Sequence, residues 1–223
     1  MGIKNVSIVL HPIFKNKMEP DTRERILKGA EELFFKYGIK SITMDDIAKH
    51  LAMSKKTIYL FFADKNEVVD CLLKESLQKD KSELDDITKK SANVIEEVFN
   101  LMKHMGAMFG KVNPNIFYDL QKYHPTAWKQ FMHFKEDCME GMVEGAIKRG
   151  IKEGLVREDV NSKVLSIMRI EQIVMGMNPD IFPPDKFKLV DVQVCMLDHF
   201  LHGICTLKGH KMINKYKQVI EEE

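Results

Sequence analysis

The stretch from Thr43 to Phe62, TMDDIAKHLAMSKKTIYLFF, constrains the fold of this 223-residue chain more than any other. Thr43 is followed three residues later by Asp46, and this pair resembles a capping box, which predicts a helix that begins at Met44. Apolar residues at helical spacing then form one face of that helix: Ile47, Ala48 and Leu51. The small side chain of Ala48 would let a second helix cross closely.

A tight turn and a second short helix follow. Ala52-Met53-Ser54 predicts the turn, with Ser54 placed to cap the next helix. That helix, from Lys55 to about Phe62, would bury Ile58 and Phe62. It would turn its polar residues outward: Lys55, Lys56, Thr57 and Tyr59. Two helices in this arrangement predict a helix-turn-helix, in which the second helix places its N-terminal polar residues in the DNA major groove.

Two more helices are predicted around this unit. Asp21 with Glu24 makes a second capping box, and Gly38 is expected to end the first helix as its C-cap. The apolar face of that first helix would comprise Ile26, Ala30, Leu33, Phe34 and Tyr37. Asp64 is expected to cap a fourth helix that continues toward Ile87. Because it would leave the small domain and enter the rest of the chain, this helix is the natural mechanical link.

Residues Arg25 to Leu73 resemble the N-terminal DNA-binding domain of the TetR family of bacterial repressors. The resemblance is carried by Ala30, Leu33, Phe34, Tyr37-Gly38, Thr43, Ile47-Ala48, Ser54, Thr57-Ile58-Tyr59, Phe62 and Asp64-Lys65-Asn66-Glu67. Two residues depart from the family pattern. Ala52 stands at a turn position where glycine is usual, which costs about 1 kcal/mol if its backbone is left-handed. Phe61 stands where a His or Tyr often reaches a phosphate, and Phe cannot donate that bond.

The predicted DNA-binding residues are Thr43, Ser54, Lys55, Lys56, Thr57, Tyr59 and Lys65. Lys55 and Lys56 lie at the start of the second helix, where lysines reach base edges or phosphates. The family resemblance implies phosphate contacts for Thr43, Tyr59 and Lys65, the last aided by the amides of a helix N-terminus. The alternatives are ordinary solvated lysines, a tyrosine at the edge of the core, and a threonine that only caps its helix.

The distribution of charge agrees with a DNA-binding head. Residues Lys15 to Leu60 hold 10 Lys and Arg against 7 Asp and Glu, whereas the chain from Phe61 onward holds 23 against 26. A mildly basic head on a mildly acidic body is typical of a DNA-binding domain attached to a domain with another task. The partner predicted for the head is therefore a double-stranded DNA operator.

The rest of the chain shows helical periodicity and no strand pattern. Helices are expected over residues 91–109, 116–123, 128–151, 160–177 and 187–207, with a charged tail that frays from Lys208. The predicted fold class is all-α: an N-terminal three-helix helix-turn-helix domain and a larger C-terminal helical domain for ligand binding and dimerisation. The predicted division is a loose arm over 1–18, a DNA-binding domain over 19–66 and the larger domain over 67–223. One hypothesis is that the native chain begins at Met18.

The family resemblance implies a small-molecule pocket in the C-terminal domain. Methionine-rich surfaces repack around varied apolar partners, so an apolar or amphipathic effector is expected. The candidate lining residues are Met102, Met105, Phe109, Phe117, Tyr118, Tyr123, Trp128, Met132 and His133. For each of these, ordinary core packing is the alternative, because a methionine and aromatic stripe at helical spacing usually belongs to the core.

The last two long helices carry heavily apolar faces. In the family such helices form a four-helix dimer interface, and the candidate interface residues are Val164, Leu165, Met168, Val190, Val194, Leu197 and Leu201. A two-fold dimer would read two half-sites about 34–36 Å apart, or at multiples of that spacing. The alternative is that these faces pack only inside one chain.

Other kinds of chemistry find little support. The four cysteines are widely spaced, which favours reduced thiols in a cytoplasmic protein. Asp198, His199 and His202 share one helical turn but lack a matching second ligand motif, so no metal site is predicted. No cofactor motif, catalytic constellation or membrane-length apolar run is found.

The leading hypothesis is thus a homodimeric, ligand-responsive DNA-binding regulator, a repressor released from a palindromic operator by a small-molecule inducer. A helical small-molecule binding protein with a vestigial DNA-binding head is the alternative. An enzyme on an all-α scaffold is a third and weaker hypothesis.

Overall fold

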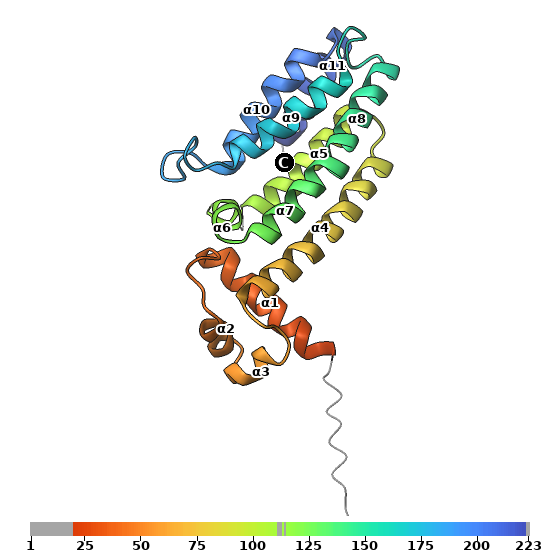
Figure 1. The fold of residues 1–223 in the computed structure, drawn as a ribbon. Helices are drawn as coiled ribbons and strands as arrows, with labels where there is room; N and C mark the ends of the chain where they lie inside the picture. Colours follow the sequence, from red (N-terminus) through yellow and green to blue (C-terminus); the bar gives the residue numbers. More distant parts are fainter. Residues whose placement is uncertain (1–19, 111–112, 114, 222–223) are drawn as a thin grey trace, which may run out of the picture.

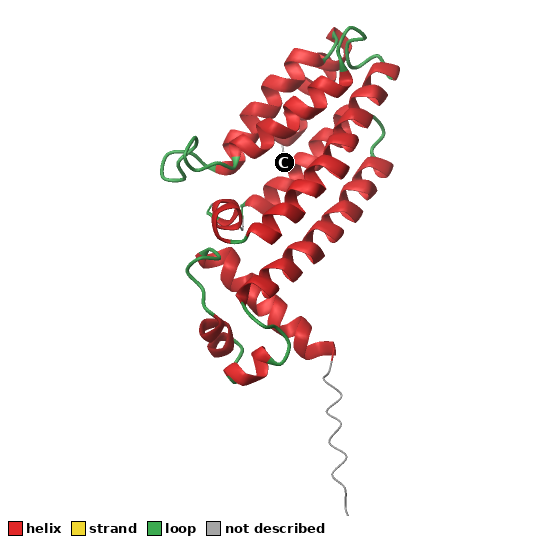
Figure 2. Ribbon diagram, in the orientation of Figure 1, coloured by secondary structure: helices red, strands yellow, loops and turns green. Residues whose placement is uncertain are grey.

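The computed structural model describes residues 20–110, 113 and 115–221, and every regular element among them is a helix. The predicted arm over residues 1–18 lies outside the described residues. Figures 1 and 2 show an elongated molecule with a small group of helices at one end and a longer bundle at the other. None of the described helices has the length and hydropathy needed to cross a membrane. The all-α fold class is confirmed.

The small end consists of α1 (Pro20–Tyr37), α2 (Met44–His50) and α3 (Lys55–Tyr59). Its core is formed by side chains that are almost fully buried: Ile26, Ala30, Phe34, Ile47, Ile58 and Phe62. Two details of α1 were predicted wrongly. The described part of α1 already includes Pro20, so Asp21 lies within the helix and is not its N-cap. Tyr37 is exposed, because it lies in the last turn, next to the left-handed Gly38 that ends the helix.

Helix α4 (Lys65–Lys90) joins the two ends of the molecule. Its 26 residues span about 39 Å at 1.5 Å per residue. Val68 and Val69 near its start are buried in the core of the small end. Helices α6 (Ile116–Tyr123) and α7 (Pro125–Phe134) also add residues to that core, although the sequence division placed the end of the small domain at residue 66.

The larger end contains α5 (Val94–Phe109), α8 (Glu140–Lys152), α9 (Ser162–Gly176), α10 (Leu189–Ile204) and α11 (Leu207–Glu221). Helix α5 begins later than the predicted residue 91, because the side chain of Asn93 accepts hydrogen bonds from the amides of Ile95 and Glu96 and so starts the helix there. Helix α8 packs along α9, and α9 packs against α10.

The long helix predicted over 128–151 is interrupted by a π-helical turn, η1 (Lys135–Met139), between α7 and α8. Lys135 in this turn is buried, and its ammonium group donates a hydrogen bond to Glu171 of α9. Such turns insert an extra residue into a helix and redirect its side chains, which is a tertiary effect that apolar periodicity does not reveal.

The prediction that the chain frays from Lys208 is wrong. Residues after Leu207 form α11, which packs on α5. Ile213 is fully buried, and the ring of Tyr216 stacks on Phe99 with 5.5 Å between ring centroids. The many charged residues of this segment lie on one side of an amphipathic helix, and the few apolar ones hold it in place.

Candidate functional site

The capping box at the start of α2 forms as predicted. Thr43 Oγ1 accepts a hydrogen bond from the amide of Asp46 at 3.2 Å, and Asp46 Oδ2 accepts one from the amide of Thr43 at 2.9 Å. The hydroxyl of Thr43 also donates to Asp46 Oδ2 at 2.6 Å. These bonds to Thr43 lower the pKa of the Asp46 carboxyl. Since the hydroxyl proton of Thr43 is already donated to Asp46, a phosphate would have to compete for it.

The turn between α2 and α3 has a left-handed residue at Ala52, whose φ is 52°. Ser54 then caps α3 by accepting a hydrogen bond from the amide of Thr57 at 3.0 Å. Its hydroxyl also lies 2.7 Å from the hydroxyl of Thr57. Ser54 and Thr57 are therefore held to each other at the start of the helix that is expected to read DNA.

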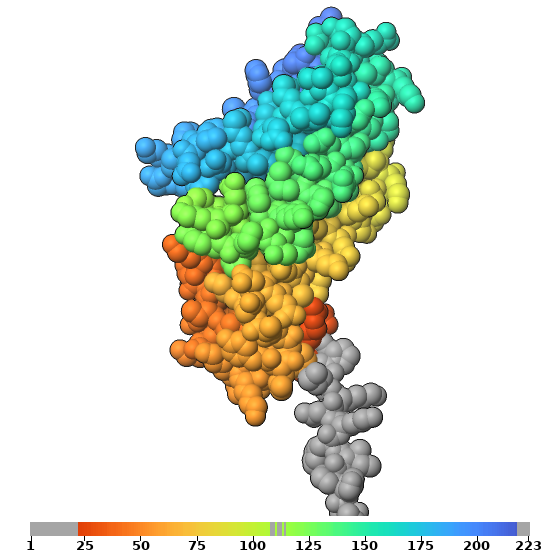
Figure 3. Space-filling model, in the orientation of Figure 1, coloured from red at the N-terminus to blue at the C-terminus, as the bar shows by residue number. Residues whose placement is uncertain are grey.

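Helix α3 turns its polar residues toward solvent. Lys56 is exposed and forms no ion pair with any described residue, and Tyr59 is 44% exposed. Lys55 differs from Lys56 because its ammonium group lies 2.8 Å from Asp45 Oδ1, which raises the pKa of Lys55. In Figure 3 the segment that carries these residues forms the lower end of the molecule, away from the bundle. The arrangement presents a small cationic face that suits a groove lined by phosphates.

Lys65 has a different setting from the one that the family resemblance implies. Its ammonium group donates to the backbone carbonyls of Ile39 and Ile42 at 3.0 and 2.9 Å. Burial lowers the pKa of Lys65. Two of its three N–H donors thus hold the loop between α1 and α2, and a phosphate contact by this residue stays a prediction.

The small end contacts α6 and α7 through polar side chains. Asp119 Oδ2 in α6 accepts a hydrogen bond from the amide of Lys40. His124, just before α7, donates from Nδ1 to Asn66 Oδ1 at 2.8 Å, and its buried Nε2 has no partner among the described residues. Burial is the main reason that the pKa of His124 is lowered. Asp119 thus contacts the backbone of the loop before α2, and His124 contacts a side chain in the first turn of α4.

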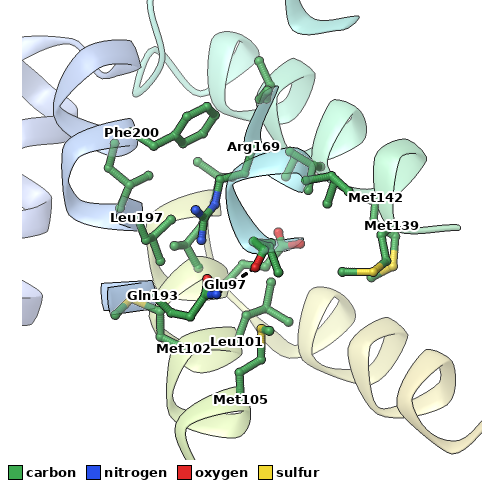
Figure 4. Close-up of a pocket in the computed structure, with 18 of the residues that line it drawn as sticks. Glu97, Leu101, Met102, Met105, Met139, Met142, Arg169, Gln193, Leu197 and Phe200 are labelled. Atoms are coloured by element: carbon green, nitrogen blue, oxygen red, sulfur yellow. Dashed lines mark hydrogen bonds between the residues drawn. The ribbon is translucent and has the colours of Figure 1, made fainter. Parts of the chain in front are cut away.

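A cavity of about 170 Å³ lies inside the larger end, between α5, α8, α9 and α10. Figure 4 shows Met139 and Met142 on one side of it, Leu197 and Phe200 of α10 on the opposite side, and Met105 of α5 below. The lining is mostly apolar and includes Leu84, Leu101, Met102, Met105, Met139, Met142, Ile170, Ile173, Leu197 and Phe200. A mostly apolar cavity with a few polar groups is the usual form of a small-molecule site.

Three charged or amide side chains line the cavity: Glu97, Arg169 and Gln193. The carboxylate of Glu97 is fully engaged, because it accepts two hydrogen bonds from Arg149 at 2.6 and 2.7 Å and one from Thr88 at 2.8 Å. Gln193 donates to the carbonyl of Ile173 at 2.9 Å, while its buried Oε1 accepts none from the described residues.

Glycine at position 176 makes room for this glutamine, since a Cβ there would lie 2.5 Å from Gln193 Nε2. The sequence reading missed Arg169 and Gln193. Arg169 could have been recognised, because it shares a helical face with Ser166, Ile170 and Ile173 and a charged residue is unusual on such a face.

The structure places the predicted pocket residues in several regions. Met102 and Met105 line the cavity. Phe117 and Trp128 instead pack against the core of the small end, and Tyr118 accepts a hydrogen bond from Lys122. The remaining predicted residues with described side chains, Tyr123, Met132 and His133, do not line the cavity either. The side chain of Phe109 lies outside the described residues. Helical spacing alone could not separate these two apolar regions of the bundle.

The apolar faces of α9 and α10 are only partly directed outward. Val164, Met168 and Val194 are exposed, together with Ile167 and Met175, which the prediction omitted. Leu197 and Leu201 are buried in the bundle core, Leu165 packs against it, and Val190 lines the cavity. These four side chains therefore do not lie on the exposed face, because each helix has an inner apolar side as well as an outer one.

Among the described residues, no three His, Cys, Asp or Glu side chains gather as a metal ion would require. Asp198 forms ion pairs with His202 and Lys217, so its carboxylate has a role without a metal ion. The four cysteines are free thiols, and burial raises the pKa of Cys205 to about 11.

Comparison with known proteins places the helix-turn-helix in a family. Residues 26–71 match the model of the bacterial regulatory proteins of the tetR family. The chain is similar to the HTH-type transcriptional regulator YvaF of Bacillus subtilis, with 25% identity over 81% of this chain and 94% of that protein.

Solved structures share the fold. A TetR-family transcriptional regulator from Agrobacterium tumefaciens aligns with a TM-score of 0.69 at 13% identity, covering 84% of this chain and all of that one. The regulator FadR of Bacillus subtilis, solved in complex with stearoyl-CoA, aligns with a TM-score of 0.58 at 19% identity, over 81% of this chain and 98% of that one.

Proposed function

This chain belongs to the TetR family of bacterial transcriptional regulators, and we propose that it is a homodimeric repressor that leaves a palindromic operator when a small molecule occupies its C-terminal cavity. The observation that carries the proposal is a helix-turn-helix with both caps formed and with Lys56 and Tyr59 facing solvent. This head is joined by one long helix to a domain that holds an apolar cavity.

A route for coupling runs through α4. Leu84 of α4 lines the cavity, while Val68 and Val69 at the other end of α4 lie in the core of the head. A ligand that favours one position of α4 would therefore change how the head is held. The ligand acts only through its different affinities for the two arrangements, and DNA in turn changes the affinity for ligand by the same factor.

Dimerisation would supply the second half-site contact. The exposed apolar side chains of α9 and α10, among them Val164, Met168 and Val194, support an interface on that face. A contiguous exposed apolar patch commonly marks a contact with another protein. The face lies on the larger end, so a two-fold partner there leaves both heads free to reach DNA.

The proposal is tested by fluorescence anisotropy with labelled duplexes from the region upstream of the protein's own gene, at two salt concentrations. A random duplex of equal length is the control. We expect sequence-selective binding. The logarithm of its association constant should fall linearly with the logarithm of the salt concentration, because each neutralised phosphate releases counterions. Binding to the upstream duplexes that is no tighter than to random DNA would contradict an operator there. If genomic fragments also give no selective binding, the alternative of a ligand-binding protein with a vestigial head is favoured.

A further inference from the structure

Arg169 is a buried cation for which the described part of the chain supplies no anionic partner. It extends from α9 into the cavity, and only 7% of its surface is exposed. Among the described residues, its Nη1 atom finds no hydrogen-bond partner, and no carboxylate lies within ion-pair distance of the guanidinium. Its guanidinium carbon lies over the ring of Phe200, 5.9 Å from the ring centroid.

The acidic groups around it are engaged elsewhere. Glu97, which lines the same cavity, is bound by Arg149 and Thr88. Glu171, two residues along α9, pairs with Lys135. Among the described residues that line the cavity, no acidic group therefore compensates the positive charge of Arg169.

An uncompensated cation in such a place is costly. Burial lowers the pKa of Arg169 to about 10, so the side chain still carries its charge at neutral pH. An unpaired charge that is moved out of water is strongly destabilising, and folded proteins usually pair or hydrogen-bond such groups. A planar guanidinium offers two parallel N–H donors that match the two oxygens of a carboxylate.

We propose that the cavity binds an alkyl carboxylate of the fatty-acid type, with its carboxylate on Arg169 and its chain against the methionines of α5 and η1–α8. The proposal rests on the proposed function, because it names the ligand class of the same cavity. Met102, Met105, Met139 and Met142 provide a flexible apolar wall for chains of different shape. The thioester group of a coenzyme A ester is uncharged, and the phosphates of coenzyme A are separated from it by the long pantetheine arm. With its acyl chain in the cavity such an ester would place no anionic group on Arg169, so we expect the free acid to be preferred.

The test is isothermal titration calorimetry on the full-length protein without DNA. The probes are decanoate, decan-1-ol and decanoyl-CoA, and the variants are Arg169→Met, Arg169→Lys and Arg157→Met. We expect wild type to prefer decanoate, and Arg169→Met to weaken decanoate binding by at least about tenfold while binding decan-1-ol as well as wild type. Arg169→Lys should retain part of the preference, because it keeps the charge but not the paired donors.

Arg157→Met is the matched control. Arg157 is half-exposed, pairs with Asp159 and does not line the cavity, so this variant removes one positive charge without touching the site. It should bind all three probes like wild type. Decan-1-ol binding and thermal unfolding of Arg169→Met also report whether that variant is folded, so a lost carboxylate site is distinguished from a lost structure.

The proposal would be overturned by equal affinity of wild type for decanoate and decan-1-ol, by undiminished decanoate affinity in Arg169→Met, or by no binding of decanoate. Tighter binding of decanoyl-CoA than of decanoate would overturn it in favour of the ester. Since no DNA is present, the result is separable from the proposed function. Decanoate binding that depends on Arg169 would stand even if the head recognised no operator, and selective operator binding would stand even if decanoate did not bind.

Discussion

Asp119 of α6 accepts a hydrogen bond from the backbone amide of Lys40, with 2.8 Å between Oδ2 and N, and these residues are 79 positions apart in the chain. The side chain of Asp119 is buried, and Lys40 lies in the loop that leads from α1 to α2. The bond therefore ties the C-terminal domain directly to the backbone just before the helix-turn-helix.

Replacing Asp119 by Ala should destabilise the protein by about 1.5–3 kcal/mol, because the amide of Lys40 loses a charged acceptor in a buried place. Urea denaturation followed by circular dichroism measures this change. Asp86→Ala is the control, since Asp86 is exposed and pairs only with Lys90 one helical turn away; it should shift stability by less than about 0.5 kcal/mol. Equal effects of the two substitutions would mean that the contact with Lys40 contributes nothing.

Replacing Ala52 by Gly should stabilise the protein by about 1 kcal/mol, since its φ of 52° is strained for a residue with a Cβ. The same substitution at Ala107, an exposed position inside α5, should destabilise by a similar amount. Thermal unfolding of both variants gives the comparison. A loss of stability in Ala52→Gly would show that the turn is not strained.

Lys56→Ala should weaken operator binding more than Lys55→Ala, because Asp45 already offsets part of the charge of Lys55. A lost phosphate contact should also reduce the slope of affinity against salt by about one unit. Tyr59→Phe should weaken binding about 2- to 10-fold if its hydroxyl donates to a phosphate. Anisotropy titrations at several salt concentrations measure all three. Lys148→Ala on α8 is the control, and an equally large effect there would contradict the assignment of the site.

The stability of the protein should fall as the pH is lowered from 7 to 5, in part because of His124. Its pKa is lowered in the folded state, so below pH 6.5 the unfolded chain binds a proton that the folded chain binds less readily. His124→Gln should reduce this loss, whereas His133→Gln should not, since His133 is exposed. Urea denaturation at pH 7, 6 and 5 provides the measurement, and identical pH profiles for wild type and His124→Gln would refute the role of this imidazole.

Met168→Glu should weaken dimerisation by at least about tenfold, because it places a charge in the apolar face of α9. Analytical ultracentrifugation over a range of protein concentrations determines the dissociation constant. Ile181→Glu makes the same change at an exposed residue of the segment between α9 and α10 and should leave the dimer intact. Equal weakening in both variants would contradict an interface on this face. A monomeric wild type would contradict the proposed homodimer.

The features of the structure that could be predicted from the sequence alone are those in which the interacting residues lie within one helical turn of each other. The capping box of Thr43 with Asp46 and the caps at Ser54 and Asp64 could be recognised, because a helix start favours particular residue types at its N-cap. For Ala52 the family resemblance gave only a condition, a cost if its backbone is left-handed, and the structure shows that its φ is 52°.

Which apolar helix faces contact each other could be seen only in the folded structure. Apolar spacing places Leu201 and Val194 alike on α10, yet one is buried in the core and the other is exposed. The cavity combines residues from five helices, and the absence of a carboxylate near Arg169 depends on Arg149 having engaged Glu97 from 52 positions away. Helical periodicity indicates that a face is buried, but the packing of the helices sets which residues that face contacts. The chemistry of the proposed ligand could therefore be inferred only from the folded chain.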